Sequence, residues 1–352
     1  MDRRYYLDLA KSGLRMPIGT DLVLREKPDE GAILASGERL GEVVEEAARR
    51  YGTPLAVPLM DLTVEKETLL TILGVEASAI PTYHFHEAPD AATFAKVAAG
   101  LGGEPTQRMR ANLEAISYIA QKTDLVACGM CIGPFSFMTK LIADPIAAVY
   151  MAGSGVTREE DAEVDAMESA LELGLEVILR SISAQIDAGA KAVIICEPAA
   201  SVAFFSPKQL AKGTDVFERL VMVPNRKVKE LLASRGADLI FHDCGELVDQ
   251  MISSFSTLDP AMMSLGSSRK LWEDAALIPD DIVLYGNLPT KRFFSSDLGV
   301  DEVKRMTCDL IEKMSATGHP FILGSECDVL SVPEVRESIS GKVDAFLHCT
   351  CG

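Results

Sequence analysis

Short apolar runs alternate with longer amphipathic segments along almost the whole chain. Short apolar runs bounded by turn residues are typical of buried strands, whereas apolar residues at i, i+3, i+4 and i+7 are typical of helices. Because the two patterns alternate, the sequence predicts βα units with a parallel sheet. The runs that predict strands cover residues 55–60, 78–85, 124–131, 190–197, 238–242, 261–265, 281–286 and 320–325.

Three of the intervening segments carry a clear helical period. Residues 37–52 place their apolar side chains on one side of a helix, and residues 299–318 do the same until Gly318, which predicts the helix end. Thr157 and Glu160 have the spacing of a capping box. We therefore expect them to open a long helix with apolar positions up to residue 186.

Eight strands that alternate with helices predict an α/β fold, a (β/α)8 TIM barrel with a helical N-terminal extension. An open doubly wound sheet is the alternative, but no glycine-rich dinucleotide fingerprint follows any predicted strand. The pattern contains no repeat or linker, so one domain is expected over residues 1–352. Within it we predict an extension over 1–54, the barrel over 55–330, and a C-terminal helix and tail over 331–352.

The charge of the chain limits its partners. Its 52 acidic and 34 basic residues give a formal net charge of −18, which disfavours nucleic acid and anionic membranes as partners. The first residues lack the apolar core of a signal peptide, and no apolar run approaches the ~18 residues of a membrane span. We therefore expect a cytoplasmic protein whose eight cysteines are reduced.

Polar side chains stand where the predicted strands end. In a barrel of this type the C-terminal ends of the strands meet at one face, and that face carries the chemistry. Any one of these residues can simply belong to a turn, but His, Cys and carboxylates together indicate a site. The strand-end residues are Asp61, His84, His86, Cys131, Glu197, His242, Cys244, Ser267, Asn287 and Cys327.

A metal site is the simplest explanation for three of these residues. His242 and Cys244 are two positions apart at the end of a strand, so their side chains point to the same side. Cys327, at the end of the last predicted strand, is the expected third ligand. One imidazole and two thiolates are a typical zinc set, and three protein ligands leave a fourth position open for substrate.

Other His and Cys groups are weaker candidates. Cys128 and Cys131 have C-x-x-C spacing but fall inside an apolar run, so packing is expected. His84 and His86 lack a nearby cysteine, so a role in the substrate pocket is preferred over metal binding. The HCTCG sequence at 348–352 is expected to form a mobile tail with at most adventitious metal binding. Cys196 and Cys308 fall on apolar faces and are expected to be structural.

Six motifs at strand ends resemble those of a known family. The segments are MDLTVE, GPFSFMTKLIADP, ICEPAAS, FHDCG, YGNLP and FILGSECDV. They are similar to the uroporphyrinogen decarboxylase superfamily, and specifically to its zinc-dependent corrinoid methyltransferase branch, from about residue 53 to 343. That branch carries His-x-Cys on the fifth strand and Cys on the eighth, which His242, Cys244 and Cys327 match.

The resemblance implies a reaction and two cofactors. Methyltransferases of this branch move a methyl group between a heteroatom bound at Zn²⁺ and the cobalt of a corrinoid (cobalamin), usually carried by a separate corrinoid protein. The decarboxylase itself uses N-terminal arginines to hold its polyanionic substrate, and Asp61 stands at the equivalent position here. We expect substrate or corrinoid contacts from Asp61, His84, Glu197 and Asn287.

The third ligand departs from the thiol-using members of the branch. They commonly have Gly-Cys-Gly there, whereas this chain has Glu326-Cys327-Asp328. Glu326 is therefore expected to tune the metal or to handle a proton. The acidic pair favours an O-demethylase reaction on a methoxylated aromatic, with Phe85, Met130, Phe135, Phe137 and Met138 as candidate walls.

Two other functions stay open. The first is a methyl-corrinoid:thiol reaction of the coenzyme M type, which calls for a basic residue to pair with a sulfonate. Arg269, Lys291 and Arg292 follow the strand ends within a few residues. The second is a non-catalytic barrel that binds a tetrapyrrole or corrinoid and contains structural zinc.

Overall fold

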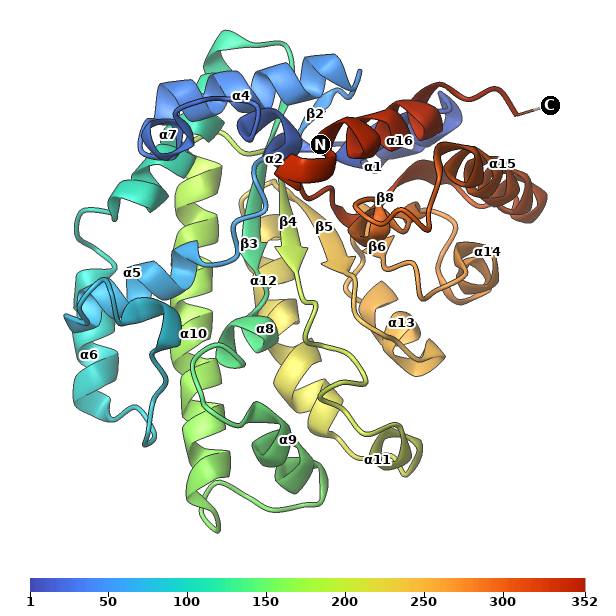
Figure 1. Cartoon of the computed structure of the whole chain (residues 1–352). Helices are drawn as coiled ribbons and strands as arrows, with labels where there is room; N and C mark the ends of the chain where they lie inside the picture. The colour runs from blue at the N-terminus through green and yellow to red at the C-terminus, as the bar shows by residue number, and fades with distance from the viewer. Residues whose placement is uncertain (352) are drawn as a thin grey trace.

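A curled sheet of eight parallel strands forms the centre of the molecule (Figure 1). The computed structural model describes residues 1–351. The strand order is β1-β8-β7-β6-β5-β4-β3-β2, and the surrounding helices make the fold α/β and TIM-barrel-like, as the sequence predicts. The strands are β1 (Arg15–Ile18), β2 (Leu55–Ala56), β3 (Val126–Ile132), β4 (Ala192–Cys196), β5 (Asp238–Asp243), β6 (Met262–Leu265), β7 (Val283–Leu288) and β8 (Phe321–Asp328).

Helices follow the strands and cover the outside of the sheet. The longest, α10, precedes β4 and packs against β3 (Figure 1). The helices are α1 (Arg3–Lys11), α2 (Thr20–Leu24), α3 (Glu30–Leu34), α4 (Gly37–Arg50), α5 (Val64–Leu73), α6 (Ala91–Gly100), α7 (Gln107–Lys122), α8 (Pro134–Met138), α9 (Pro145–Gly153), α10 (Ala162–Asp187), α11 (Pro207–Ala211), α12 (Val223–Ser234), α13 (Asp249–Ser256), α14 (Leu271–Asp274), α15 (Val300–Thr317) and α16 (Arg336–His348). Among these described segments, none is long and apolar enough to cross a membrane.

The strands are buried on both faces, which explains their nearly continuous apolar sequences. In β4, Ile194 packs inside the barrel with Ile240 and Met262, whereas its neighbours Val193 and Ile195 belong to the core beneath the helices. Side chains alternate between the two faces of a strand. The barrel interior is therefore a packed core, and the chemistry must lie at its end.

The first strand was not predicted. β1 lies inside the segment expected to be a helical extension, and it pairs with β8, so residues 1–54 supply part of the barrel wall. Its four residues, RMPI, include Pro17, and such a short run gives almost no periodic signal. Within the barrel, Tyr285 Oη of β7 donates a hydrogen bond to the Met16 carbonyl at 2.9 Å and helps to hold β1.

One predicted strand is wrong. Residues 78–85 form a single 3₁₀ turn, Ile80–Thr82, followed by one isolated bridge between Phe85 and Ile142. Pro81 lies at the start of that turn, and proline cannot donate a hydrogen bond to a sheet ladder. The other seven predicted strands overlap β2 to β8, although β2 covers only Leu55–Ala56 of the predicted residues 55–60.

The barrel has a seam between β1 and β2. These two strands end the order of the sheet, and no backbone ladder joins them in the described structure. A side chain connects the two strands instead. Thr20, two residues after β1, donates its Oγ1 hydrogen to the carbonyl of Val57, directly after β2, at 2.7 Å. Seven ladders and one side-chain seam therefore enclose the interior.

Two local expectations need correction. The capping box forms only in part: the Thr157 amide donates to Glu160 Oε2 at 3.0 Å, but α10 begins later and is capped by Asp161. Cys308 and Cys351 are joined by a disulfide, so the expectation that all eight cysteines are reduced is wrong for this pair. Helix α16 packs on α15, and this packing returns the end of the chain to Cys308.

Candidate metal centre at the end of the barrel

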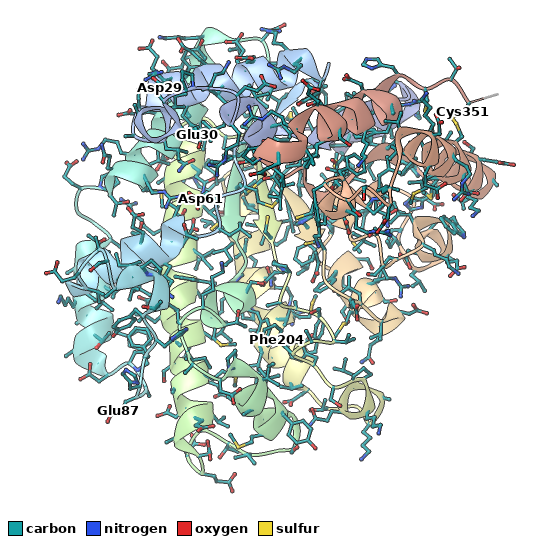
Figure 2. All side chains as sticks on the ribbon, viewed as in Figure 1. Asp29, Glu30, Asp61, Glu87, Phe204 and Cys351 are labelled. Carbon is teal, nitrogen blue, oxygen red and sulfur yellow. A yellow bond between two sulfur atoms is a disulfide. The ribbon has the colours of Figure 1, made fainter. Side chains whose placement is uncertain are left out.

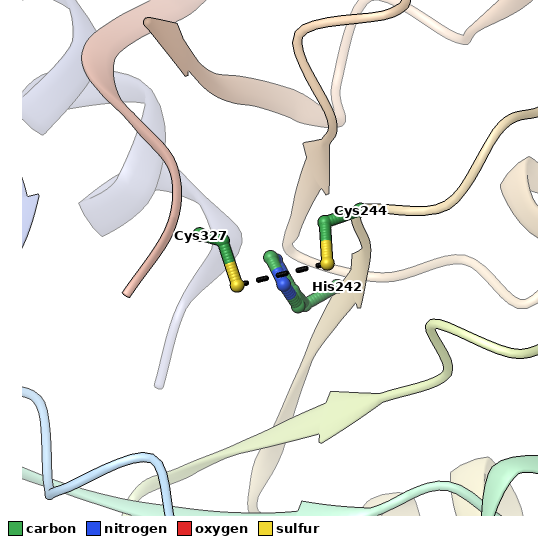
Figure 3. A group of neighbouring side chains, drawn as sticks. All are labelled: His242, Cys244 and Cys327. Carbon is green, nitrogen blue, oxygen red and sulfur yellow. Dashed lines mark hydrogen bonds between the residues drawn. The ribbon is translucent and has the colours of Figure 1, made fainter. Parts of the chain in front are cut away.

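The three predicted metal ligands come together from two strands. His242 is the penultimate residue of β5, Cys244 follows that strand directly, and Cys327 lies near the end of β8. Their ligand atoms all lie within 4.8 Å of one another, and the two sulfur atoms are 3.6 Å apart. Figure 3 shows the imidazole beside the line that joins the two sulfurs.

The imidazole of His242 is oriented by the neighbouring strand. Its Nδ1 lies 2.9 Å from Ser264 Oγ of β6. When Nδ1 carries the proton and donates it to Ser264, Nε2 presents its lone pair. Nε2 is buried and has no hydrogen-bond partner among residues 1–351. A buried nitrogen without a partner is costly, and a bound metal ion would satisfy it, so the donor set fits zinc.

The two thiols differ in their tendency to ionise. Their mutual hydrogen bond, together with the positive charge of Lys291, lowers the pKa of Cys244. The same contact, together with burial, raises the pKa of Cys327, because a second thiolate so close would be repelled. One thiolate is therefore ready for a cation, and a bound metal ion deprotonates a coordinating thiol outright.

Lys291 brings a positive charge next to this pair. Its Nζ donates to the carbonyl oxygen of Cys244 at 3.0 Å. Burial acts to lower the pKa of Lys291, but the charge and hydrogen bond of Cys244 and the charges of Cys327 and Glu326 together raise it, so the side chain stays protonated. In the sequence, only its place a few residues after a strand end indicated this role.

Glu326 stands beside a ligand in the sequence, but its carboxylate points elsewhere. Oε2 accepts a hydrogen bond from the Ser267 amide at 3.0 Å, and Oε1 accepts one from the Lys291 amide at 3.3 Å. Side chains alternate along β8, which separates Glu326 from Cys327. Glu326 therefore holds the loops after β6 and β7, including the backbone of Lys291.

Met60 is a residue at the site that sequence reasoning missed. Its thioether sulfur lies 3.8 Å from Cys327 Sγ, and its side chain is half-buried. In the sequence, a methionine at the end of an apolar run cannot be told from one that packs in the core. It supplies a soft, apolar wall beside the ligands.

Glu197 is fully buried and holds the start of α8. Its carboxylate accepts hydrogen bonds from the amides of Phe135 (3.1 Å) and Ser136 (2.8 Å) and from Asn225 Nδ2 (2.8 Å). Burial raises the pKa of Glu197, and these hydrogen bonds partly oppose the shift. The contacts are those of a structural cap, not of a substrate ligand.

Asn287 also binds backbone. Its Nδ2 donates to the carbonyls of Gly266 (2.8 Å) and Arg269 (2.9 Å), so it fixes the loop after β6. Asp61 accepts hydrogen bonds from the Thr63 amide and hydroxyl and pairs with Arg108 (Figure 2 labels Asp61).

The remaining candidates are His84 and the five apolar residues that were expected to form walls of the substrate pocket. His84 is half-buried, and burial lowers its pKa, assisted by the charges of Lys66 and His86. Of the candidate apolar walls, Phe135, Phe137 and Met138 are fully buried in the core, and Phe85 and Met130 are partly exposed. Only these last two can therefore meet a ligand without rearrangement.

The sequence matches the uroporphyrinogen decarboxylase (URO-D) family over residues 22–337. This chain is a member of the uroporphyrinogen decarboxylase family. The uroporphyrinogen decarboxylase of Bordetella parapertussis is 26% identical over 186 residues, which are 52% of this chain and 49% of that protein. The chain thus aligns with about half the length of this family relative.

A solved structure extends the likeness over the full length. A methyltransferase from Methanosarcina mazei superposes with a TM-score of 0.66 at 19% identity, and the match covers 98% of both chains. At this identity the likeness establishes a common fold. The resemblance to the URO-D superfamily expected from the strand-end motifs is thereby confirmed.

Proposed function

We propose that this URO-D family member is a zinc-dependent methyltransferase that works with a corrinoid protein. The observation that carries the proposal is the His242, Cys244 and Cys327 cluster, with its three ligand atoms within 4.8 Å of one another. The fold shared with a methyltransferase supports it. We favour transfer from a methoxylated aromatic to the reduced corrinoid, an O-demethylase reaction.

The residues around the cluster fit this chemistry. Zinc held by the three ligands would supply a Lewis acid for the ether oxygen of the substrate. Ser264 orients the imidazole of His242, and when Ser264 accepts the Nδ1 proton, Nε2 is free to bind the metal. Lys291 stays protonated and places positive charge next to the ligands, where it can pair with a phenoxide as that leaves. Met60 provides an apolar contact for the substrate.

A second candidate is transfer from the methylated corrinoid to a thiol. The observation that favours it is again Lys291, because a sulfonated or carboxylated thiol needs a cation beside the metal. A structural metal site in a non-catalytic barrel is a weaker alternative. Structural zinc sites usually have four protein ligands, and the described residues bring three into this cluster.

The direction of transfer can be tested with free cobalamin in place of the corrinoid protein. The zinc-loaded enzyme is mixed with cob(I)alamin and a methoxylated phenol, and formation of methylcobalamin is followed by its absorbance. A parallel reaction contains methylcobalamin and a thiol. We expect methylation in the first reaction, and none with the Cys244→Ala variant. Rapid demethylation by the thiol, with no transfer from any methoxy donor, would instead establish the second candidate.

A further inference from the structure

A second group of cysteines lies at the end of the chain. The sulfur atoms of Cys308, Cys349 and Cys351 all lie within 4.8 Å of one another. Cys308 and Cys351 form a disulfide, and Cys349 is a free, half-buried thiol beside it. Cys351 lies at the edge of the molecule, next to the end of the chain (Figure 2).

The fold builds this cluster from three elements. Cys308 belongs to α15, and the chain leaves α16 in an extended conformation at Cys349 (φ −62°, ψ 138°). In extended chain, residues i and i+2 face the same side, so Cys349 and Cys351 can both face Cys308. The third element is β1, through Arg15.

Arg15 anchors the cluster. Its Nη1 donates to the carbonyls of Phe346 at 2.9 Å and Cys349 at 2.8 Å, and lies 3.4 Å from Cys349 Sγ. These contacts fix the chain directly after α16. The segment 348–352 expected to be a mobile tail is thus tied to β1 and α15 as far as Cys351, and Gly352 lies outside the described residues.

The cluster is open to solvent. A groove of about 520 Å³ is lined by Cys308 and Cys349 together with Lys304, Asp344 and His348. The His348 side chain is exposed, and its Nδ1 lies 3.1 Å from the Asp344 carbonyl, which leaves Nε2 for another partner. Metal ions and small reductants can therefore reach the sulfurs.

We propose that the reduced thiols of Cys308, Cys349 and Cys351 bind one soft metal ion, Zn²⁺ or Cu⁺, at a site separate from the barrel centre. Thiolates select these ions over harder cations. The three sulfurs are enough for Cu⁺, and zinc would complete its four-coordinate set with a water molecule from solvent. The disulfide closes the site, because it removes two of the three ligands.

Reduction of the Cys308–Cys351 disulfide makes the metal site available. A dithiol reductant supplies two electrons and two protons, so the Cys308–Cys351 bond breaks into two thiols and the reductant becomes a cyclic disulfide. Metal binding by the three thiols then releases three protons to solvent. Loss of the metal and oxidation by a disulfide oxidant reverse both steps.

The test uses the full chain with the barrel site disabled. In the Cys244→Ser/Cys327→Ser variant, any tightly bound ion belongs to the tail. The protein is reduced with dithiothreitol, the reductant is removed anaerobically, and the protein is titrated separately with Zn²⁺ and with Cu⁺. Elemental analysis should then find one Zn²⁺ or one Cu⁺ per chain. Binding of only one of the two ions would show which of them the site selects. With the disulfide intact we expect none.

Further substitutions on the same background locate the ligands. Cys308→Ser should abolish binding, whereas Cys128→Ser, which changes a buried thiol of the barrel interior, should leave it unchanged. If the background variant does not fold, the reduced wild-type protein should bind two ions and the Cys308→Ser protein one. A reduced protein that binds neither ion outside the barrel centre would overturn the proposal. The inference does not depend on the proposed function, because each site is removed by its own substitutions.

Discussion

Ser264 and His242 are paired in the register of β6 and β5, and their side chains meet with Oγ 2.9 Å from Nδ1. This contact fixes the rotation of the imidazole, which leaves Nε2 on the side of the two sulfurs. Removing a residue that hydrogen-bonds a metal-binding histidine typically weakens metal affinity by about 10–100-fold. We therefore expect Ser264→Ala to weaken zinc binding by about that factor, measured by competition with a chelator. Ser264→Thr keeps the hydroxyl and should bind zinc nearly as well as wild type; equal affinity in the Ala variant would contradict the role.

Cys327 supplies the ligand that completes the cluster from β8. Cys327→Ala, like Cys244→Ala, should lose zinc and methyl transfer together, because two ligands hold the ion far less well than three. The fold should survive, since the barrel is built by seven strand ladders that do not include the metal. Elemental analysis and thermal unfolding measure both effects. Full zinc retention by Cys327→Ala would remove the third ligand from the site, and loss of cooperative unfolding would indicate structural zinc.

Lys291 should influence substrate binding and turnover without holding the metal. A charge-assisted hydrogen bond contributes roughly 1.5–3 kcal/mol, so Lys291→Met should reduce kcat/KM for a substrate that becomes or carries an anion by about 10–100-fold. Zinc content should remain at the wild-type value. Lys270→Met is the control, because Lys270 is exposed and pairs only with Glu273 among described carboxylates. Unchanged kinetics in Lys291→Met would show that the ammonium group does not meet the substrate.

Glu197 should be important for stability. Glu197→Ala leaves two amides of α8 and the Asn225 side chain without their buried acceptor, which should lower the free energy of unfolding by about 2–4 kcal/mol. Glu197→Gln keeps one acceptor oxygen and should lose less. Urea unfolding measures both variants. Wild-type stability combined with a raised KM would instead return Glu197 to the list of substrate ligands.

Glu65 should make stability depend on pH. Its Oε1 accepts hydrogen bonds from Cys131 (3.2 Å) and Ser181 (2.9 Å), whereas Oε2 is buried without a partner. Burial raises the pKa of Glu65 above its ordinary value of 4.5. The folded protein therefore binds this proton more tightly than the unfolded chain does. The resulting stabilisation is complete below pH 4.5 and is lost as the pH rises through the folded pKa.

Glu65→Gln removes this dependence. The difference in free energy of unfolding between the variant and wild type should shift in favour of the variant above pH 4.5, by about 1.4 kcal/mol for each unit by which the pKa is raised. Unfolding by urea at several pH values from 4 to about 9 measures it. Glu104→Gln, which removes a well-exposed charge, is the control. Parallel curves for wild type and Glu65→Gln would show that the carboxyl titrates normally.

The sequence predicted most of the barrel because its strands are buried on both faces. A continuous apolar run followed by a polar residue marks both the strand and its end, and this signal located His242 and Cys327. The runs at 15–18 and 78–85 show the limits of such reasoning. Residues 15–18 form a strand too short to give a periodic signal in the sequence. Residues 78–85 have a strand-like composition but contain Pro81 and do not form a strand.

The roles of individual polar residues were harder to predict. The position of Glu326 next to Cys327 indicated a catalytic role, but the pleat of β8 turns its carboxylate toward backbone amides. Lys291 and Met60 meet the cluster through contacts between distant segments. Such contacts depend on loop conformation, which a local pattern does not encode. The same holds for Cys308 and Cys351, which only the packing of α16 on α15 brings together.

The pairing of β1 with β8 sets an order of events during protein synthesis. β1 leaves the ribosome roughly 300 residues before β8, its ladder partner, a delay of about 15–60 s at usual rates of translation. Met16 and Ile18 are buried in the finished barrel. Until β8 is made, they lie on an unpaired strand edge, which can pair wrongly with another chain. The strand that ends this wait also carries Cys327, so the wall of the barrel and the metal cluster both wait for the same late segment of the chain.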